Sequence, residues 1–254
     1  MTASPLSARA QREREAYDQG LRRDGYMRMF SHTCHLFLQR RDQIIRQELQ
    51  YADGKKVLEL GSISWGSWIE KNHIQPGELH CINISQEELN QGIGAARDSS
   101  VKPQFRLMDA HHLEFQDECF DLVFGCAILH HLDFVKALDE VRRVLKPGGR
   151  IVFVEPMGVN PMGKLVRAMT PFARTVDEKP LMLNELAALE QRFDTRYYFE
   201  ELFSVPLGVL SGLLFRSPEN WLTRFAFKID LAVERVFPPL RPFFRHVLVT
   251  GVRK

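Results

Sequence analysis

Apolar side chains recur every three or four positions along residues 6–50, with Arg and Glu between them, a spacing that predicts helix. After Gly54, which marks a stop, short apolar runs alternate with helical stretches. The apolar runs predict strands over residues 57–60, 79–83, 105–108, 120–124, 151–154, 195–199 and 246–250. Strands that alternate with helices are typical of an α/β fold, in which a parallel sheet with right-handed crossovers carries helices on both faces.

Polar residues and turns mark where the predicted helices begin and end. Ser85, with Glu88 three residues further on, has the pattern of a capping box, so a helix is expected from there to about Arg97. Asp133 is expected to cap the next helix. The turn Pro147-Gly148-Gly149 is expected to end that helix.

Two segments depart from the alternation. Residues 156–183 contain four prolines and predict a long loop or lid, while residues 203–245 are an apolar insertion before the last strand. We therefore predict a helical cap over residues 1–50 and an α/β domain over residues 51–254, in which the two irregular segments cover the substrate. Plain core packing explains the apolar residues of the insertion equally well.

Composition limits the classes of partner. The 254 residues suffice for one large α/β domain, and a net charge of +2 without a long basic run gives no sign of nucleic-acid binding. The four cysteines contain no C-x-x-C pair, so neither a zinc site nor a redox motif is predicted. The N-terminal residues lack the apolar core of a secretory signal. The longest apolar stretch, residues 203–215, is shorter than the roughly 20 residues that cross a bilayer. We expect a cytoplasmic protein, and peripheral contact with a membrane surface stays open.

The carboxyl ends of the predicted strands carry small or polar residues. In open parallel sheets the ligand lies at these ends, near the switch in strand order. Small residues let backbone N–H groups approach a ligand, a polar side chain after the second strand can bond ribose hydroxyls, and an acidic one after the third can accept a bond from an adenine amino group. The residues concerned are Glu59, Gly61, Ser62, Asn83, Ile84, Asp109, Ala110, Gly125 and Cys126.

Five motifs occur in order along the middle of the chain. They are Val57-Leu58-Glu59-Leu60-Gly61, Asp109-Ala110, Phe120-Asp121-Leu122-Val123, Leu129-His130-His131-Leu132 and Val144-Leu145-Lys146-Pro147-Gly148-Gly149. Together they resemble the class I S-adenosyl-L-methionine (SAM)-dependent methyltransferases, in particular the branch with the ubiquinone/menaquinone C-methyltransferases. The resemblance covers about residues 55–155 and a final strand at 245–252.

The resemblance implies a Rossmann-like, seven-stranded, mostly parallel sheet that binds SAM as its cofactor. It implies that Glu59 and Gly61 line the region of the methionine and ribose. It also implies that Asn83 faces the ribose and Asp109 the adenine, with the backbone at residues 125–126 beside the methyl group.

The sequence departs from the family pattern after the first two strands. Ile63 and Trp65 stand where the second and third glycines of G-x-G-x-G are usual, and Asn83 stands where the family has Asp or Glu. An amide can still hydrogen-bond but carries no charge, and loss of one charge-assisted bond weakens binding by about 1 kcal/mol, or roughly tenfold. A repurposed pocket on the same fold is therefore an alternative.

Two pairs of histidines follow strand ends. His130 and His131 come after the fourth strand, where substrate would meet the methyl group, and a neutral imidazole there can act as a base. The alternative is that one histidine caps a helix and the other packs. His111 and His112 are expected at the adenine edge or on the surface. Adjacent histidines are poor ligands on a helix face, so no metal site is predicted.

Substrate-side residues are expected outside the motifs. Tyr17 and Tyr26 are placed to cover the pocket, while Lys164, Arg167 and Arg174 either meet an anion or form a solvated basic face. We expect a SAM-dependent methyltransferase acting on a small, lipophilic acceptor. Two alternatives stay open: a diverged enzyme that cyclises or isomerises its substrate without methyl transfer, and a non-catalytic partner subunit. The oligomeric state is also open.

Overall fold

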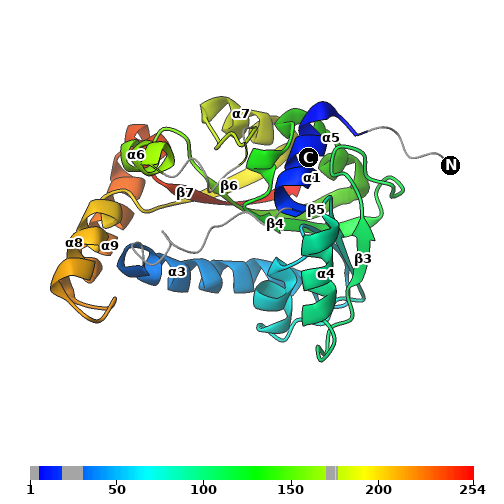
Figure 1. Cartoon of the computed structure of the whole chain (residues 1–254), viewed down its shortest axis with the longest axis horizontal. Helices are drawn as coiled ribbons and strands as arrows, with labels where there is room; N and C mark the ends of the chain where they lie inside the picture. Colours follow the sequence, from blue (N-terminus) through cyan, green and yellow to red (C-terminus); the bar gives the residue numbers. More distant parts are fainter. Residues whose placement is uncertain (1–5, 19–30, 170–174, 176) are drawn as a thin grey trace.

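Seven strands form one mixed sheet in the computed structural model, which describes residues 6–18, 31–169, 175 and 177–254 (Figure 1). The strands are β1 Lys56–Leu60, β2 Glu78–Asn83, β3 Gln104–Leu107, β4 Phe120–Cys126, β5 Leu145–Pro156, β6 Phe193–Glu200 and β7 His246–Arg253. Their order is β3-β2-β1-β4-β5-β7-β6, and β7 alone runs antiparallel to its neighbours β5 and β6. The expected Rossmann-like, seven-stranded, mostly parallel sheet is confirmed.

The central strands are those with the longest apolar runs. Residues 57–60, 122–125 and 151–155 are buried throughout, as expected for parallel strands covered on both faces. The chain passes from β1 outward to β2 and β3 and then returns to β4 on the other side of β1. The carboxyl ends of β1 and β4 therefore flank the switch in strand order, where ligands bind in such sheets.

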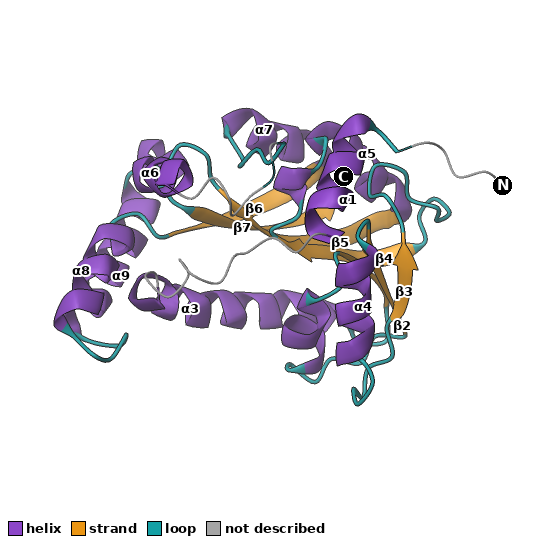
Figure 2. Cartoon of the chain, viewed as in Figure 1, coloured by secondary structure: helices purple, strands orange, loops and turns teal. Residues whose placement is uncertain are grey.

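Helices cover both faces of the sheet (Figure 2). The helices are α1 Ala8–Asp18, α3 Ser31–Leu49, α4 Gln86–Ala95, α5 Phe134–Val144, α6 Pro161–Met169, α7 Leu183–Arg192, α8 Ser204–Leu214 and α9 Trp221–Val236. On one face, Ile45 and Leu49 of α3 pack with Trp68 against the strands. On the other, α5 and α7 contribute Leu138 and Leu189.

Both predicted N-cap residues cap their helices, but one predicted helix end is wrong. The capping box is also incomplete, because the Ser85 amide donates to Oδ1 of Asn83 at 2.9 Å rather than to Glu88. The Ser85 hydroxyl accepts a bond from the Glu88 amide at 3.3 Å, and an Asp133 oxygen accepts one from the Lys136 amide at 3.5 Å. Helix α5 ends at Val144, before the Pro147-Gly148-Gly149 turn rather than at it. The turn lies within β5, where the register with β4 shifts and Gly148 has a φ of +75°. A left-handed glycine thus bends this strand instead of stopping the helix.

The two irregular segments both contain helix, and residues 203–245 are largely helical. Residues 156–183 contain α6, and residues 203–245 contain α8 and α9. The predicted N-terminal helix corresponds to α1 and α3, while residues 19–30, including Tyr26, lie outside the described residues, as does Arg174. Helix α1 lies beside α4, over the carboxyl ends of the strands (Figure 1).

Candidate active site

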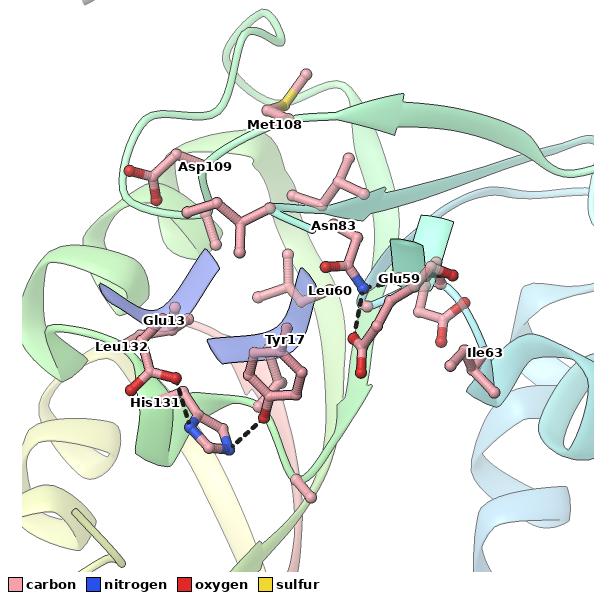
Figure 3. Close-up of a pocket in the computed structure, with 18 of the residues that line it drawn as sticks. Glu13, Tyr17, Glu59, Leu60, Ile63, Asn83, Met108, Asp109, His131 and Leu132 are labelled. Carbon is pink, nitrogen blue, oxygen red and sulfur yellow. Dashed lines mark hydrogen bonds and ion pairs between the residues drawn. The ribbon is translucent and has the colours of Figure 1, made fainter. Parts of the chain in front are cut away.

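A cavity of about 170 Å³ lies where β1, β2, β3 and β4 end, and residues of α1 form part of its wall (Figure 3). Nine of the eleven residues predicted for the site line it. They are Glu59, Gly61, Ser62, Asn83, Ile84, Asp109, Ala110, Cys126 and His131. His130 and Gly125 are not among the lining residues.

The turn after β1 depends on Gly61 and on the carboxylate beneath it. Gly61 has a φ of +119°, which side chains with a Cβ rarely adopt, and its N–H donates to the Ile82 carbonyl at 2.8 Å. Oε1 of Glu59 accepts a bond from the Ser64 amide at 2.7 Å, and Oε2 accepts one from the Cys81 thiol at 3.2 Å. Burial raises the pKa of Glu59 to about 7, against the opposing effect of these bonds. Glu59 therefore holds the turn onto the ends of β1 and β2.

The two bulky residues of this turn leave the cavity open. Trp65 is only 1% exposed and is packed in the core on the α3 side of the sheet. Its indole N–H donates to the Ser62 carbonyl at 3.2 Å, and its ring meets Phe105 edge-on. Ile63 lines the cavity and is 52% exposed. The departure from the glycine pattern thus adds an apolar rim without filling the site.

A carboxylate stands beside Asn83 after all, supplied by Glu88 of α4. Nδ2 of Asn83 donates to Oε2 of Glu88 and to the Ser62 hydroxyl, both at 3.0 Å. Oδ1 of Asn83 accepts a bond from the Ser85 amide at 2.9 Å. Both Asn83 groups are therefore used within the protein, and Glu88, which also lines the cavity, offers the negative charge that the family pattern places after β2. Sequence reasoning treated Glu88 as a helix cap only.

Asp109 is held in place by the histidine two residues after it. Its Oδ1 accepts bonds from the His111 amide at 2.9 Å and from His111 Nδ1 at 2.6 Å, while Nε2 of His111 accepts one from the Asp133 amide at 2.7 Å. Because an amide N–H can only donate, the proton of this imidazole is on Nδ1. Burial raises the pKa of Asp109, but the bonds from His111 outweigh burial and lower it. His111 thus orients an ionised Asp109 at the cavity.

Two side chains of α1 meet His131 at the cavity wall. The Tyr17 oxygen lies 2.8 Å from Nε2 of His131, and Oε2 of Glu13 lies 3.0 Å from Nδ1 (Figure 3). The Thr175 hydroxyl donates to the other oxygen of Glu13. A carboxylate beside Nδ1 favours the tautomer with its proton there, which leaves Nε2 to accept from the phenol. Burial lowers the pKa of His131 by more than Glu13 raises it, so the ring is neutral.

Polar contacts tie α1 to the strand ends at both of its ends. Near its start, Nε of Arg9 donates to the His131 carbonyl at 2.9 Å. At its end, Asp18 accepts a bond from the Ser85 hydroxyl at 2.6 Å. The expected place of Tyr17 over the pocket agrees with this arrangement. Glu13, which sequence reasoning missed, lies four positions earlier on the same helix face, and that spacing was the available signal.

His130 and Gly125 have places in the core of the strand ends. Nδ1 of His130 lies 2.7 Å from Oε2 of the fully buried Glu155, whose other oxygen accepts a bond from the Leu129 amide at 2.8 Å. A Cβ on Gly125 would lie 2.9 Å from the Leu60 carbonyl, so only glycine fits between these strands. The two adjacent histidines thus differ: His131 reaches the cavity and His130 braces the turn after β4.

One cluster has the composition of a metal site. Ligand atoms of His130, His131 and Glu178 lie within 4.8 Å of one another. Nδ1 of His130 and both ring nitrogens of His131 already have polar neighbours, so an ion would have to displace them. The expected lack of a metal stays a prediction.

The charge of the cavity suits SAM. Its wall includes the carboxylates of Glu13, Glu59, Glu88 and Asp109, and no Lys or Arg is among the lining residues that the structure describes. SAM carries a sulfonium and an ammonium group against a single carboxylate, so a cavity rich in carboxylates complements it. The residues present therefore fit this cofactor, both through the Gly61 turn, which leaves room for a ligand, and through the negative charge of the wall.

Comparison with known proteins identifies the class. Residues 58–153 match the family model described as a methyltransferase domain. The ubiquinone/menaquinone biosynthesis C-methyltransferase UbiE of Cupriavidus pinatubonensis is 35% identical over 107 residues, which are 40% of this chain and 43% of that relative. The chain thus matches less than half the length of that relative.

Solved structures agree on the fold. A geranyl diphosphate C-methyltransferase from Streptomyces coelicolor A3(2) has a TM-score of 0.65 at 14% identity, covering 99% of this chain and 100% of that one. The [4+2]-cyclase SpnF has a TM-score of 0.54 at 17% identity, covering 84% of this chain and 80% of that one. The fold is therefore that of the class I methyltransferases. Residues 58–153 thus match a methyltransferase domain, and over this part the chain is similar to the UbiE relatives.

Proposed function

We propose that this protein transfers a methyl group from SAM to a small acceptor. The observation that carries the proposal is the convergence of Glu59, Glu88 and Asp109 on one cavity at the ends of adjacent strands, beneath the Gly61 turn. The methyltransferase-domain match over residues 58–153 supports it.

The residues of the cavity have separate tasks in this proposal. When bound, SAM supplies a methyl group on a positively charged sulfur, which a nucleophile can displace in line. Gly61 lets backbone N–H groups approach the ligand, while Glu88 and Asp109 provide acceptors for hydroxyl and amino groups. Ala127, which lines the cavity after β4, has a φ of +53°, the kind of strained backbone that accompanies binding sites.

Tyr17 and His131 are the groups that we assign to proton transfer. A hydroxyl or acidic carbon that attacks a methyl group must lose a proton. The Tyr17 oxygen can take that proton as its own passes to the neutral Nε2 of His131, 2.8 Å away. The imidazolium so formed has Oε2 of Glu13 beside its Nδ1, which stabilises the charge.

The acceptor is proposed to be lipophilic and uncharged. Apolar side chains make up much of the remaining wall, namely Ile63, Ile84, Met108, Ile128 and Leu132. The complex of the Streptomyces coelicolor neighbour contains geranyl diphosphate and Mg²⁺. Here the described lining residues offer no Lys or Arg to pair with a diphosphate, which favours an acceptor without phosphate groups. Residues 203–245 and 156–183 contribute nothing to the described wall, so their predicted role as a substrate cover stays a prediction.

The location of the protein also stays a prediction. Within the described residues, no helix combines the length and the apolar character that crossing a membrane requires. A cytoplasmic protein with peripheral membrane contact agrees with that finding.

Calorimetry with SAM and S-adenosylhomocysteine tests the proposal. We expect both to bind, and Asp109→Asn to weaken binding by about tenfold because one charged acceptor is lost. Glu114→Gln, an exposed carboxylate nearby in the chain, is the matched control and should bind as the parent does. A folded protein that shows neither heat nor a thermal shift with either compound would remove the proposal.

The mass of the product separates the alternatives. A gain of one methyl group supports methyl transfer. An isomer of unchanged mass supports a cyclising or isomerising enzyme, an activity for which SpnF is named on the same fold. Binding without turnover of any acceptor supports a partner subunit.

A further inference from the structure

Helix α8 presents its large apolar side chains to solvent. The residues that it buries include the small Ser204, Gly208 and Ser211, whereas Leu213 and Leu214 are 80% and 62% exposed. A helix on the surface of a globular protein normally buries its large apolar residues and exposes its polar ones. Apart from the buried Val205, the pattern of α8 is the reverse, so core packing does not explain Leu213 and Leu214.

Helix α9 also presents large apolar side chains to solvent. It buries Leu222, Thr223, Ala226 and Asp230, while Trp221, Phe225 and Val236 are 67%, 53% and 63% exposed. Trp221 and Phe225 are four residues apart and Val236 continues the same side of the helix, so the three lie in one row.

The inner sides of both helices are fixed to the rest of the protein. A Cβ on Gly208 would lie 2.4 Å from the Cα of Thr33, so α8 and α3 touch through their backbones. The Ser211 hydroxyl accepts a bond from Asn220 at 2.7 Å and lies 3.1 Å from Nδ1 of His32. Attachment of the two helices therefore does not use the exposed apolar residues, and the surface that they form is held firmly.

Basic side chains run alongside the apolar row. Arg224, Lys228 and Arg235 are exposed and follow one another at helical spacing on α9, and Arg216 is exposed in the preceding loop. Within residues 213–236, all of which the structure describes, the exposed acid is Glu219, whose Oε1 lies 2.8 Å from Nη2 of Arg224. The surface is thus apolar with a positively charged border.

We propose that this surface docks on an anionic lipid bilayer and lies in its interface without crossing it. We call it the apolar–basic surface and define its apolar part as Leu210, Leu213, Leu214, Trp221, Phe225 and Val236. Aromatic and aliphatic side chains beside Lys and Arg are the combination that holds helices at a membrane surface. A second copy is a poorer partner, because a two-fold contact sets each patch against itself and would bring the basic rows together.

The docking surface is separate from the candidate active site. Helices α8 and α9 lie at the opposite end of the molecule from α1 and α4 (Figure 1). A test of membrane docking is therefore independent of whether the protein transfers a methyl group.

Vesicle binding by the full chain tests the proposal. Of the three tryptophans, Trp65 and Trp68 are buried and Trp221 is exposed, so the emission of Trp221 reports on the surface. We expect emission to shift to shorter wavelength, and the protein to sediment, with vesicles that contain phosphatidylglycerol. Binding should be weaker with pure phosphatidylcholine and at high salt, because the basic residues then contribute less.

Three variants distinguish docking through this surface from non-specific adsorption to vesicles. Leu213→Glu should lower partitioning by about tenfold or more, since a charge replaces an inserted leucine. The double variant Lys228→Glu/Arg235→Glu should lower it at low salt by about 25-fold or more, at about fivefold for each positive charge removed. Val135→Glu on α5 replaces an apolar residue that is 48% exposed and lies outside the surface, and this variant should bind as the parent does.

Two results would overturn the proposal. One is absence of sedimentation and of an emission shift with every vesicle. The other is dimer formation that Leu213→Glu abolishes, without vesicle binding, which would make the surface a contact between copies. Far-ultraviolet circular dichroism of each variant confirms that it is folded.

Discussion

The phenol oxygen of Tyr17 lies 2.8 Å from Nε2 of His131, although 114 positions separate the two residues in the chain. Glu13 faces the opposite nitrogen of the ring at 3.0 Å. Helix α1 therefore contributes polar side chains to the cavity as well as covering it, and in the proposed reaction a proton passes from Tyr17 to His131 beside the carboxylate of Glu13.

Removal of the imidazole should slow the reaction without loss of cofactor binding. His131→Gln keeps a hydrogen-bonding side chain but cannot take a proton, so kcat should fall by about 10²- to 10⁴-fold. Tyr17→Phe should also lower kcat, because without the phenol oxygen no group carries the proton from the acceptor to His131. Release of S-adenosylhomocysteine measures the rate, and calorimetry should show cofactor affinity near that of the parent. His112→Gln, which alters an exposed histidine, is the control. Unchanged turnover in His131→Gln would show that the ring is structural.

Restoring the acid that the family has after β2 should weaken cofactor binding. In Asn83→Asp, two carboxylates would meet where Nδ2 of Asn83 now donates to Glu88 at 3.0 Å. Like charges so close raise the pKa of one partner and disturb both, so we expect about a tenfold loss in affinity for S-adenosylhomocysteine.

The double variant Asn83→Asp/Glu88→Gln should regain that affinity, because it exchanges the two groups. Glu87→Gln, an exposed neighbour, serves as the control in the same titration. Tighter binding by Asn83→Asp alone would mean that Glu88 does not serve the ligand.

The case of Glu88 shows where sequence reasoning reached its limit. The strand ends could be located because buried parallel strands read as unbroken apolar runs, and parallel strands bring their carboxyl ends to one edge. This placed Asn83 and Asp109 correctly at the cavity. The side chain of Glu88 had two partners within reach, and its choice of Asn83 depends on how α4 sits on the sheet.

The sequence also could not show which way side chains point, either for adjacent histidines or for apolar helices. His130 and His131 share one short turn, yet one faces Glu155 and the other Tyr17, which no pattern of residue types distinguishes. The apolar residues of α8 and α9 suited core packing as well as exposure. On α8, the exposure of Leu213 and Leu214 follows from the close backbone contact at Gly208, which places small residues inward.

Stability should respond to pH through Glu59. Burial raises its pKa to about 7 in the folded protein, against 4.5 in the unfolded chain. Between these values the folded state holds a proton that the unfolded state lacks, so the contribution of Glu59 to the free energy of unfolding falls as pH rises from 4.5 to 7 and is constant above. Urea titrations should show that Glu59→Gln gains on the order of 2–3 kcal/mol relative to the parent between pH 4.5 and pH 8. Glu48→Gln, which alters a partly buried carboxylate on α3, is the control in the same titrations. If the difference in the free energy of unfolding between Glu59→Gln and the parent stayed constant from pH 4.5 to pH 8, Glu59 would not be the titrating group.

A buried ion pair links α3 to the end of β6. Nε of Arg41 donates to Oε2 of Glu200 at 2.9 Å, and the side chain of Glu200 is fully buried while that of Arg41 is 12% exposed. Burial raises the pKa of Glu200 although Arg41 opposes the rise. Glu200 therefore depends on its partner to stay ionised inside the protein.

Loss of the arginine should destabilise the fold strongly at neutral and alkaline pH. Arg41→Met keeps the aliphatic stem but leaves Glu200 without its counter-charge, so the free energy of unfolding should fall by about 3–5 kcal/mol. At acid pH Glu200 takes up a proton and part of that loss disappears. Arg41→Met/Glu200→Gln should recover most of the stability, because neither charge remains.

The control is Lys71→Ala, since Lys71 pairs with Asp42, the neighbour of Arg41, at 3.8 Å with both side chains more than half exposed. That variant should lose less than about 1 kcal/mol. If Arg41→Met were as mild as the control in urea titrations at pH 8, the pair would not stabilise the joint between α3 and β6.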